Sequence, residues 1–431
     1  MKLRNQLLAL GCILAFAAIG WLYVRNWVVQ KPFGIIVFLS DGLVTRHLTM
    51  ARLYDGGADQ RLTLESFPNV AIVRNAANDF AVPDDAAAAT AIATGYRGNH
   101  RALSMDAAGQ PLRTIAALAR KEGRAFGIVS DGSLTNPVAA AFYAHASDAR
   151  EGEALALQMV EQFRPDVALG GGENLFIPGT GPGAREGGRT DGRNLVTELQ
   201  GAGVEIVRTR VELENLPSYH PAPIVGLFAP RALAYSDVIE AGSRQPSLSD
   251  MVRRAIVFLQ SSRNGYVLVV DASLVGSAAE ANAGERAINE TIALDHAVAI
   301  AVKYAGPKSL IMAVGKHSTG GLSMNGYPLR QDHGMALLGA NAAGYPYLTW
   351  ATGPHGPANT GPLSLTPATP PQTPPPPPGS ADPRHEPAAF QTPSALNNAE
   401  DVLALGMGKG SERLRGFIDN TDIFEILKEA L

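Results

Sequence analysis

Five short runs of apolar residues recur along this chain, and each ends at a polar or turn-forming residue. Residues 34–39 lead through a serine into Asp41, and residues 266–270 lead directly into Asp271. Continuous apolar runs are typical of parallel strands that are buried on both faces of a sheet. The other three runs cover residues 125–130, 166–169 and 309–314.

Helix-like patterns separate these runs. One covers residues 112–122, ahead of the run at 125–130, and a longer one covers residues 278–304. This alternation predicts the α/β fold class, with a mostly parallel central sheet and helices on both faces. Ligands of such sheets bind at the carboxyl ends of the strands, so Asp41 and Asp271 are candidate site residues.

The composition excludes some classes of function. The chain has 431 residues, 46% of them hydrophobic and 18% charged, and a net charge of −4. A chain with no basic excess offers no electrostatic surface for nucleic acid, so we expect no nucleic-acid partner. Its single cysteine, Cys12, lies in the apolar N-terminus, so the rest of the chain forms no disulfide.

The N-terminus is predicted to direct export. Lys2 and Arg4 precede an apolar segment over residues 7–24. Residues 15–17 (Ala-Phe-Ala) fit a signal-peptide cleavage site, whereas the aromatic residues that follow fit an uncleaved membrane anchor. We favour the anchor.

Residues 1–30 are therefore interpreted as a membrane anchor or signal peptide, and residues 31–431 as one domain. The expected location is the inner membrane with a periplasmic domain, or periplasmic or secreted if the N-terminus is cleaved. A Pro-rich segment over residues 362–393 is interpreted as an exposed loop inserted in the domain, with a docking site for a partner as the alternative.

The segment over residues 82–95 contains an Ala-rich run, which favours a helix. Asp84 and Asp85 precede the run, where an N-cap residue and a first-turn acid belong. The N-terminus of a helix is a favourable place for an anion such as phosphate.

These features occur in an order that resembles the alkaline phosphatases from Phe33 to Leu431, and the fold expected is alkaline-phosphatase-like. The resemblance implies hydrolysis of phosphate monoesters with two zinc ions and one magnesium ion, phosphate or another anion as ligand, and a homodimer. Its motifs are Ser40-Asp41-Gly42, the helix at Asp85, and residues 136–145, 169–172, 226–228, 270–274, 317–321 and 416–421.

The site positions that the resemblance implies are occupied by unusual residues. The serine nucleophile of the family corresponds to Asp85. The first zinc site corresponds to Gly276, Glu280 and Asn397; the second to Asp41, Asp85, Lys316 and His317; and the magnesium site to Asp41, Asp271, Asn136 and Val138. Among these, Asp41, Asp271, Glu280 and His317 are candidate metal ligands, and we expect either no metal or a single magnesium or zinc ion.

Lys316 is expected to lie where the family has a zinc ligand. A cation a few ångströms from a dication repels it, whereas the same cation neutralises buried carboxylates. We therefore hypothesise that a network of Lys316 with Asp41, Asp85 and Asp271 has replaced the metals.

Three roles remain open for Asp85: a helix-capping acid paired with Lys316, a ligand of one remaining metal, or a nucleophile that forms an acyl phosphate. Arg150 follows the Ala144-His145 pair. It is either near the position of the family's phosphate-binding arginine, or it starts a helix at the surface.

The favoured function is an exported pseudoenzyme with an anion-binding or scaffold role. The alternative is an active phosphatase with a reduced metal set.

Overall fold

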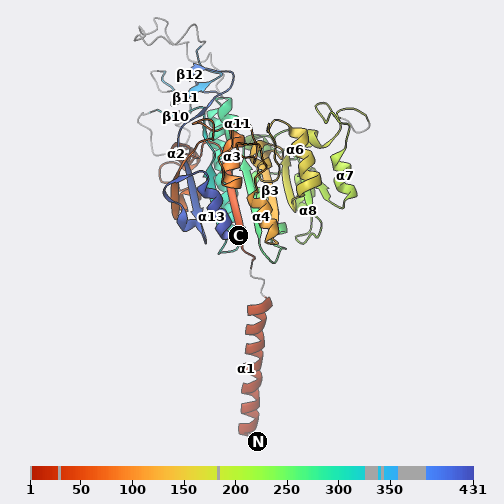
Figure 1. Ribbon diagram of the computed structural model, residues 1–431. Helices are drawn as coiled ribbons and strands as arrows, with labels where there is room; N and C mark the ends of the chain where they lie inside the picture. Colours follow the sequence, from red (N-terminus) through yellow and green to blue (C-terminus); the bar gives the residue numbers. More distant parts are fainter. Residues whose placement is uncertain (1, 28–30, 182–184, 326–337, 341–343, 358–384) are drawn as a thin grey trace.

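The computed structural model describes residues 2–27, 31–181, 185–325, 338–340, 344–357 and 385–431 (Figure 1). A ten-stranded sheet forms the centre, in the order β15-β2-β14-β8-β1-β7-β3-β4-β6-β5. Every neighbouring pair in it is parallel except the two pairs made by β14. The predicted fold class, a mostly parallel α/β sheet, is confirmed.

The strands of this sheet are β1 (Gly34–Ser40), β2 (Asn69–Arg74), β3 (Ala125–Ser133), β4 (Val167–Gly171), β5 (Glu205–Val207), β6 (Ile224–Leu227), β7 (Tyr266–Ala272), β8 (Leu310–Gly315), β14 (Val402–Met407) and β15 (Arg415–Asp419). A smaller sheet contains β10 (Ser323–Met324), β11 (Leu348–Gly353) and β12 (Ala388–Gln391), and β9 (Ser318–Thr319) pairs with β13 (Asn397–Asn398).

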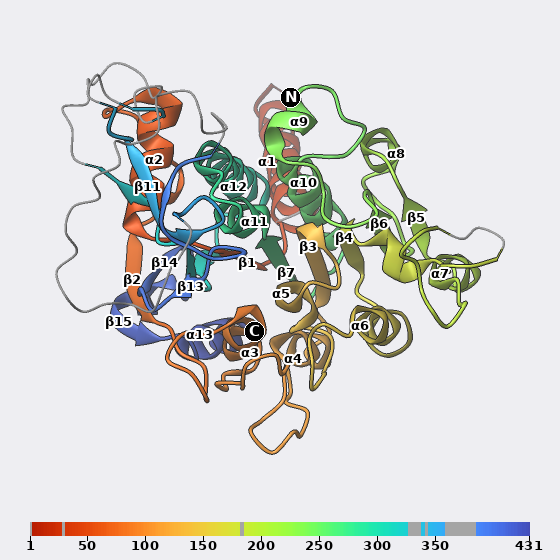
Figure 2. The same cartoon turned by 90° about the horizontal axis from the view of Figure 1, so that it is seen from above.

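The α-helices are α1 (Lys2–Trp27), α2 (Thr45–Gly56), α3 (Asp85–Thr94), α4 (Ile115–Lys121), α5 (Pro137–Ala140), α6 (Gly152–Gln158), α7 (Leu195–Gly201), α8 (Arg210–Asn215), α9 (Ser236–Glu240), α10 (Leu248–Leu259), α11 (Leu274–Glu280), α12 (Gly284–Tyr304) and α13 (Asp422–Ala430). Figure 2 shows α3, α4, α6 and α13 on one side of the sheet, and α2, α9, α10 and α12 on the other.

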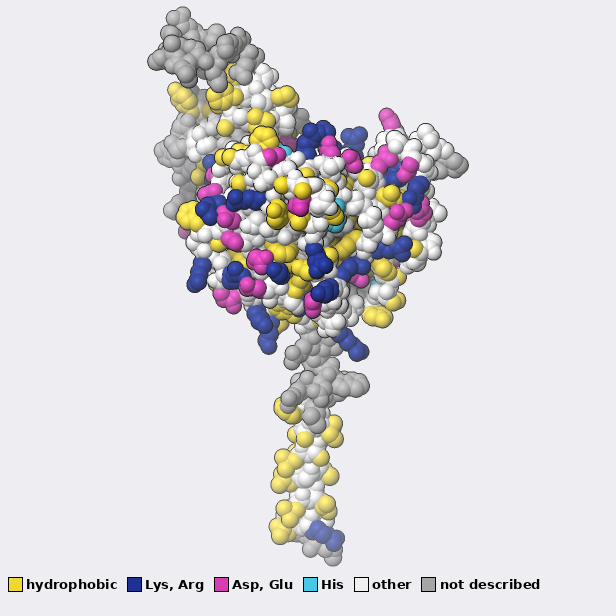
Figure 3. Space-filling view, viewed as in Figure 1, with side chains coloured by type: hydrophobic (Ala, Val, Ile, Leu, Met, Phe, Trp, Pro, Cys, Tyr) yellow, Lys and Arg dark blue, Asp and Glu magenta, His cyan; other side chains and the backbone are white. Residues whose placement is uncertain are grey.

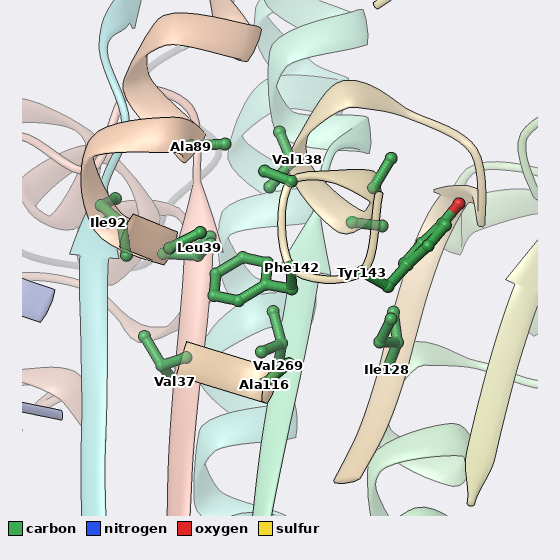
Figure 4. Close-up of a cluster of buried hydrophobic side chains, with 14 of the residues drawn as sticks. Val37, Leu39, Ala89, Ile92, Ala116, Ile128, Val138, Phe142, Tyr143 and Val269 are labelled. Carbon is green, nitrogen blue, oxygen red and sulfur yellow. The ribbon is translucent and has the colours of Figure 1, made fainter. Parts of the chain in front are cut away.

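The two faces of the sheet form two separate cores, because side chains alternate along each strand. Val37 and Leu39 of β1 pack with Ile92 of α3 on one face. Figure 4 shows this cluster between the strands and the helices. Ile36 and Phe38 point the other way and pack in the cluster that contains residues of α10 and α12.

The helices differ from the predicted ranges in one instructive place. The pattern over residues 278–304 is two helices, α11 and α12, instead of one. Asn282 lies between them in the left-handed conformation, with a φ of 55°. The amide of Gly284, at the start of α12, donates to the carboxylate of Glu386. A side-chain acceptor thus caps the second helix, which periodicity alone does not reveal.

The N-terminal helix contains the one segment of the described chain, Leu3–Trp21, that is long and apolar enough to cross a membrane. None of this segment is buried, and Figure 3 shows hydrophobic side chains along the helix as it extends from the domain. An anchor and a signal peptide both meet this criterion.

The predicted Pro-rich loop falls mainly outside the described residues, which exclude 358–384. Its last part differs from the prediction, because Ala388–Gln391 forms strand β12. This strand lies beyond the run of prolines, where every residue has the amide hydrogen that strand pairing needs, and it pairs parallel to β11.

Candidate active site

Three adjacent parallel strands bring together side chains that are far apart in the sequence. Leu39 of β1 is in register with Asp271 of β7 and with Val314 of β8, so these three side chains point to the same face. Two residues further on, Asp41 and Lys316 continue this face just past the ends of β1 and β8. The face is the one that α3 covers, and the site lies at the carboxyl edge of the sheet.

Helix α3 begins at the expected position. Asp84 is the N-cap, and its Oδ1 accepts a hydrogen bond from the amide of Ala87 at 2.9 Å. Its other oxygen accepts from the amide of Arg101 at 2.7 Å. Asp84 therefore caps the helix, and Asp85 is its first residue. Because the Asp85 carboxylate is not used for capping, it is available to Lys316, just past the end of β8.

Lys316 binds that carboxylate. Its side chain is 1% exposed, and Nζ lies 2.7 Å from Oδ1 of Asp85 and 2.9 Å from Oδ1 of Asp41. The predicted proximity of Lys316 to these two carboxylates is confirmed. Asp271 also acts on Lys316 through its charge, but its own hydrogen bond comes from Ser130 Oγ at 2.9 Å.

His317 joins the same cluster. Its Nε2 lies 3.0 Å from Oδ1 of Asp85 and 3.5 Å from Oδ1 of Asp41. Its Nδ1 lies 3.4 Å from Oγ1 of Thr319, which donates to Oδ1 of Asn397 at 3.1 Å. Because the one hydroxyl proton of Thr319 goes to Asn397, the Thr319 oxygen can accept from Nδ1. Nε2 can then donate to Asp85, as an imidazolium does.

The charges stabilise one another. Burial alone would raise the pKa of Asp85, but Lys316 and His317 outweigh it and hold that pKa well below its usual range. Burial alone would lower the pKa of Lys316, but Asp41, Asp85 and Asp271 raise it above its usual value. The pKa of His317 is also raised, because Asp41 and Asp85 outweigh its burial. The cluster is therefore internally neutralised.

Asp271 behaves differently. Its side chain is fully buried, and burial raises its pKa to about 7 although Lys316 and Ser130 act in the opposite direction. Its Oδ1 has no hydrogen-bond partner among the described residues.

Asp41, Asp85 and His317 form one group that can hold a metal ion, with ligand atoms within 4.8 Å of one another. The oxygen atoms that this group would offer are close to Lys316, however. Nζ lies within hydrogen-bonding distance of Oδ1 of both carboxylates. A metal ion that bound through these two Oδ1 atoms would compete with the Lys316 ammonium for them.

The first zinc position of the family lacks a side chain and the room for one. A Cβ added to Gly276 would lie 1.7 Å from Oδ2 of Asp41. Glu280 lies at the exposed end of α11, and its pKa is raised by burial and by the charges of Asp41 and Asp85. Asn397 is held by Thr319 and by a hydrogen bond from its Nδ2 to the carbonyl of Pro83.

The magnesium position has equally few ligands. Asp41 is bonded to Lys316, and Asn136 donates to Ser273 Oγ at 3.4 Å. Val138 is 1% exposed and belongs to the hydrophobic core shown in Figure 4. The positions named by the resemblance therefore hold fewer metal ligands than two zinc ions and one magnesium ion need.

Arg150 has no contact with this cluster among the described residues. Its side chain is 72% exposed and binds Asp148, with Nη2 2.7 Å from Oδ2 and Nε 3.0 Å from Oδ1. Arg101 binds the same carboxylate at 3.0 Å. Arg101 is linked to the start of α3 through Asp84, so it is the arginine tied to that helix N-terminus.

Sequence reasoning missed Arg101, Ser130 and Thr319. Ser130 could have been found, because it ends a predicted strand next to the one that carries Asp271. Arg101 has a φ of 66°, which nothing in its sequence indicates. Thr319 lies two residues after His317, and its role depends on the pairing of β9 with β13.

The protein is thus of the α/β class, with its candidate site at the carboxyl ends of parallel strands and beside a helix N-terminus, where ligands of such folds bind. The family follows from comparison with known proteins. The family profile described as alkaline phosphatase matches residues 34–357, and this chain belongs to the alkaline phosphatase family.

Relatives include tissue-nonspecific alkaline phosphatase of Gallus gallus, 29% identical over 69% of this chain and 65% of that protein. Alkaline phosphatase 4 of Drosophila melanogaster is 28% identical over 93% of this chain and 76% of that protein. The chain thus spans slightly less than two thirds of the Gallus relative.

Solved structures show the same fold. The alkaline phosphatase of Thermus thermophilus has a TM-score of 0.71 and 22% identity, and covers 95% of this chain and 94% of its own. The enzyme of the Antarctic bacterium TAB5 has a TM-score of 0.68 and 20% identity, over 93% of this chain and 98% of its own. The recognised family and the alkaline-phosphatase-like fold are both confirmed.

Proposed function

We propose that this protein is an exported, membrane-anchored member of the alkaline phosphatase family with lost or strongly reduced phosphomonoesterase activity. It keeps a scaffold or anion-binding role, with phosphate or a related anion as ligand. The single observation that carries the proposal is the position of Lys316, whose Nζ hydrogen-bonds to Asp85 and forms an ion pair with Asp41. These are the carboxylates that a metal would need.

Two further features support it. Asp85, where the family has its serine nucleophile, is engaged by Lys316 and His317 together. Gly276 contributes no ligand, and the Asp41 carboxylate fills the space beside it. A carboxylate held by two cations is a weak nucleophile, because an attack would have to break both interactions.

The second candidate is an active phosphatase with a reduced metal set. It is favoured by the group of Asp41, Asp85 and His317, whose ligand atoms are close enough to hold one ion. This candidate requires Lys316 to leave the carboxylates when the metal binds.

Phosphate release from 4-nitrophenyl phosphate by the full chain in detergent tests both candidates. The assay covers a range of pH with zinc, magnesium or manganese added singly, beside an Asp85→Ala variant. We expect no metal-dependent turnover above the variant. Metal-dependent turnover that Asp85→Ala abolishes would instead establish the active phosphatase.

A matched control separates the site from general damage. Asp59 is an exposed aspartate without a hydrogen bond to the site, so Asp59→Ala should behave as the unmodified chain in every assay. Binding of inorganic phosphate, measured by calorimetry in the absence of substrate, then distinguishes an anion-binding role from a scaffold role.

A further inference from the structure

A cavity of about 700 Å³ lies on the face of the sheet opposite the candidate active site. Its lining residues come from β3, from the helices α2, α8, α9, α10, α11 and α12, and from the segments next to α9 and α10. Figure 2 shows α2, α9, α10 and α12 on this side of the sheet. Ser130 of β3 points to the active-site face and bonds to Asp271. The next residue, Asp131, points to the other face and lines the cavity. The cavity thus lies on the other face from the Lys316 cluster, although the charges of Asp131 and Asp271 act on each other through the sheet.

Two buried carboxyl groups line this cavity. Asp131 is 5% exposed and Glu290 is 4% exposed. Oδ1 of Asp131 accepts from the amides of Ser273 and Leu274, at 2.7 and 3.1 Å. Oε1 of Glu290 accepts from the amide and the hydroxyl of Ser236, at 2.7 and 2.8 Å.

The second oxygen of each group has no such donor. Among the described residues, no hydrogen bond reaches Oδ2 of Asp131 or Oε2 of Glu290. Both groups line this one cavity, and burial raises the pKa of Asp131, with the charges of Asp271 and then Glu290 adding to the effect. Both oxygens are accessible from the cavity, where a water molecule or a ligand can supply a donor.

The other ionisable groups of the wall are mostly acidic. Arg210 is the one lysine or arginine among the lining residues, and it is already paired with Asp250 at 3.1 Å. Asp55 and Glu240 add further carboxylates at the rim, and Asp237, also there, lies 3.6 Å from Arg286. The cavity therefore favours a positively charged occupant.

The size and the apolar lining indicate an organic cation. A volume of about 700 Å³ is that of a small-molecule site and far exceeds what a bare metal ion fills. Leu233, Leu274 and Ile292 add apolar walls. We propose that this cavity binds a small organic ammonium compound, whose NH groups donate to Asp131 and Glu290 while its hydrocarbon part contacts the apolar walls.

Calorimetric titration of the full chain in detergent with 1,4-diaminobutane, in an amine-free buffer, tests the proposal. We expect saturable binding that Glu290→Gln and Asp131→Asn each weaken at least tenfold. Both variants keep the shape of the side chain, and circular dichroism with thermal unfolding shows whether each is folded. Because two variants are used, one that fails to fold leaves the other as the test.

Two controls test whether binding requires the positive charge of the ligand and the carboxyl groups of the cavity. Butane-1,4-diol has a similar chain without charge and should not bind. Glu122 is an exposed glutamate outside the cavity, so Glu122→Gln should bind as the unmodified chain does. Absence of saturable diamine binding, or binding unchanged in both cavity variants, overturns the proposal. Binding of Ca²⁺ or Mg²⁺ in place of the diamine, lost in the same variants, overturns it in favour of a metal site.

Discussion

Nζ of Lys316 lies 2.7 Å from Oδ1 of Asp85, which joins the end of β8 to the first residue of α3. The two residues are 231 positions apart in the sequence. This contact places an ammonium against the residue that the family resemblance assigns to the nucleophile position. It makes the centre of this protein an ion-pair cluster with strong consequences for stability and metal binding.

Replacement of Lys316 by methionine should destabilise the fold. The variant leaves Asp41, whose side chain is 8% exposed, without its cation, and breaking a buried pair costs about 3 kcal/mol or more. Urea unfolding measures the loss. Lys121→Met, at an exposed lysine, should change the free energy of unfolding by less than about 0.5 kcal/mol. Equal effects of the two variants would contradict the importance of the cluster.

Restoration of family-type ligands should create metal affinity. Gly276→Asp alone should be destabilising, because its Cβ would lie 1.7 Å from Oδ2 of Asp41. Combined with Lys316→Asp, the competing ammonium is gone and Asp41 is free to move. We expect the double variant to bind zinc at least tenfold more tightly than the unmodified chain in calorimetric titration. Unchanged zinc affinity would show that other residues prevent metal binding.

Loss of the cap of α3 should have a smaller effect. Asp84→Ala removes the acceptor for the amides of Ala87 and Arg101. Removal of an N-cap side chain costs about 1 kcal/mol. Chemical unfolding of this variant is compared with Asp59→Ala, at an exposed residue with no capping role. A midpoint that does not move in Asp84→Ala would mean that the Ala-rich helix needs no cap.

Glu290 should make stability depend on pH. Burial raises its pKa from 4.5 to about 7, aided by Asp237 and opposed by Arg286 and the Ser236 hydrogen bonds. The folded state keeps the proton at a pH where the unfolded chain has lost it. The stabilisation is therefore complete below pH 4.5 and is lost as the pH rises through 7.

The difference between the two ends of this range is on the order of 3 kcal/mol. Thermal unfolding in amine-free buffers between pH 4.5 and 8 measures it, and Glu290→Gln should remove this component of the slope. Asp131 also faces this region, with a raised pKa, and so contributes to the residual slope of the variant. Identical pH profiles for the variant and the unmodified chain would contradict the prediction.

The sequence alone was sufficient to predict the parallel sheet and to identify Asp41 and Asp271 as residues of the site. Apolar runs that end at Asp41 and Asp271 identified parallel strands, because side chains buried on both faces leave a continuous signal. The N-cap at Asp84 could also be predicted from the sequence, because only a few residue types, aspartate among them, are preferred at that position. The position of Lys316 followed from the family resemblance.

The rest depended on tertiary contacts. The break between α11 and α12 is set by Asn282 and by Glu386, a residue 102 positions away from the amide that it caps. The surface position of Arg150 depends on Asp148, a close competitor for the guanidinium. The cavity at Asp131 is lined by residues of six helices, so no local pattern could predict it.

The direction of β1 has a consequence for access. This strand begins at Gly34, a few residues after α1, and ends next to Asp41. At about 3.3 Å per residue its seven residues span about 23 Å. If α1 is embedded in a bilayer, the Lys316 cluster faces away from the lipid by the full depth of the sheet. Molecules that approach from the aqueous side then meet the cluster at the end of the strand that is remote from the anchor.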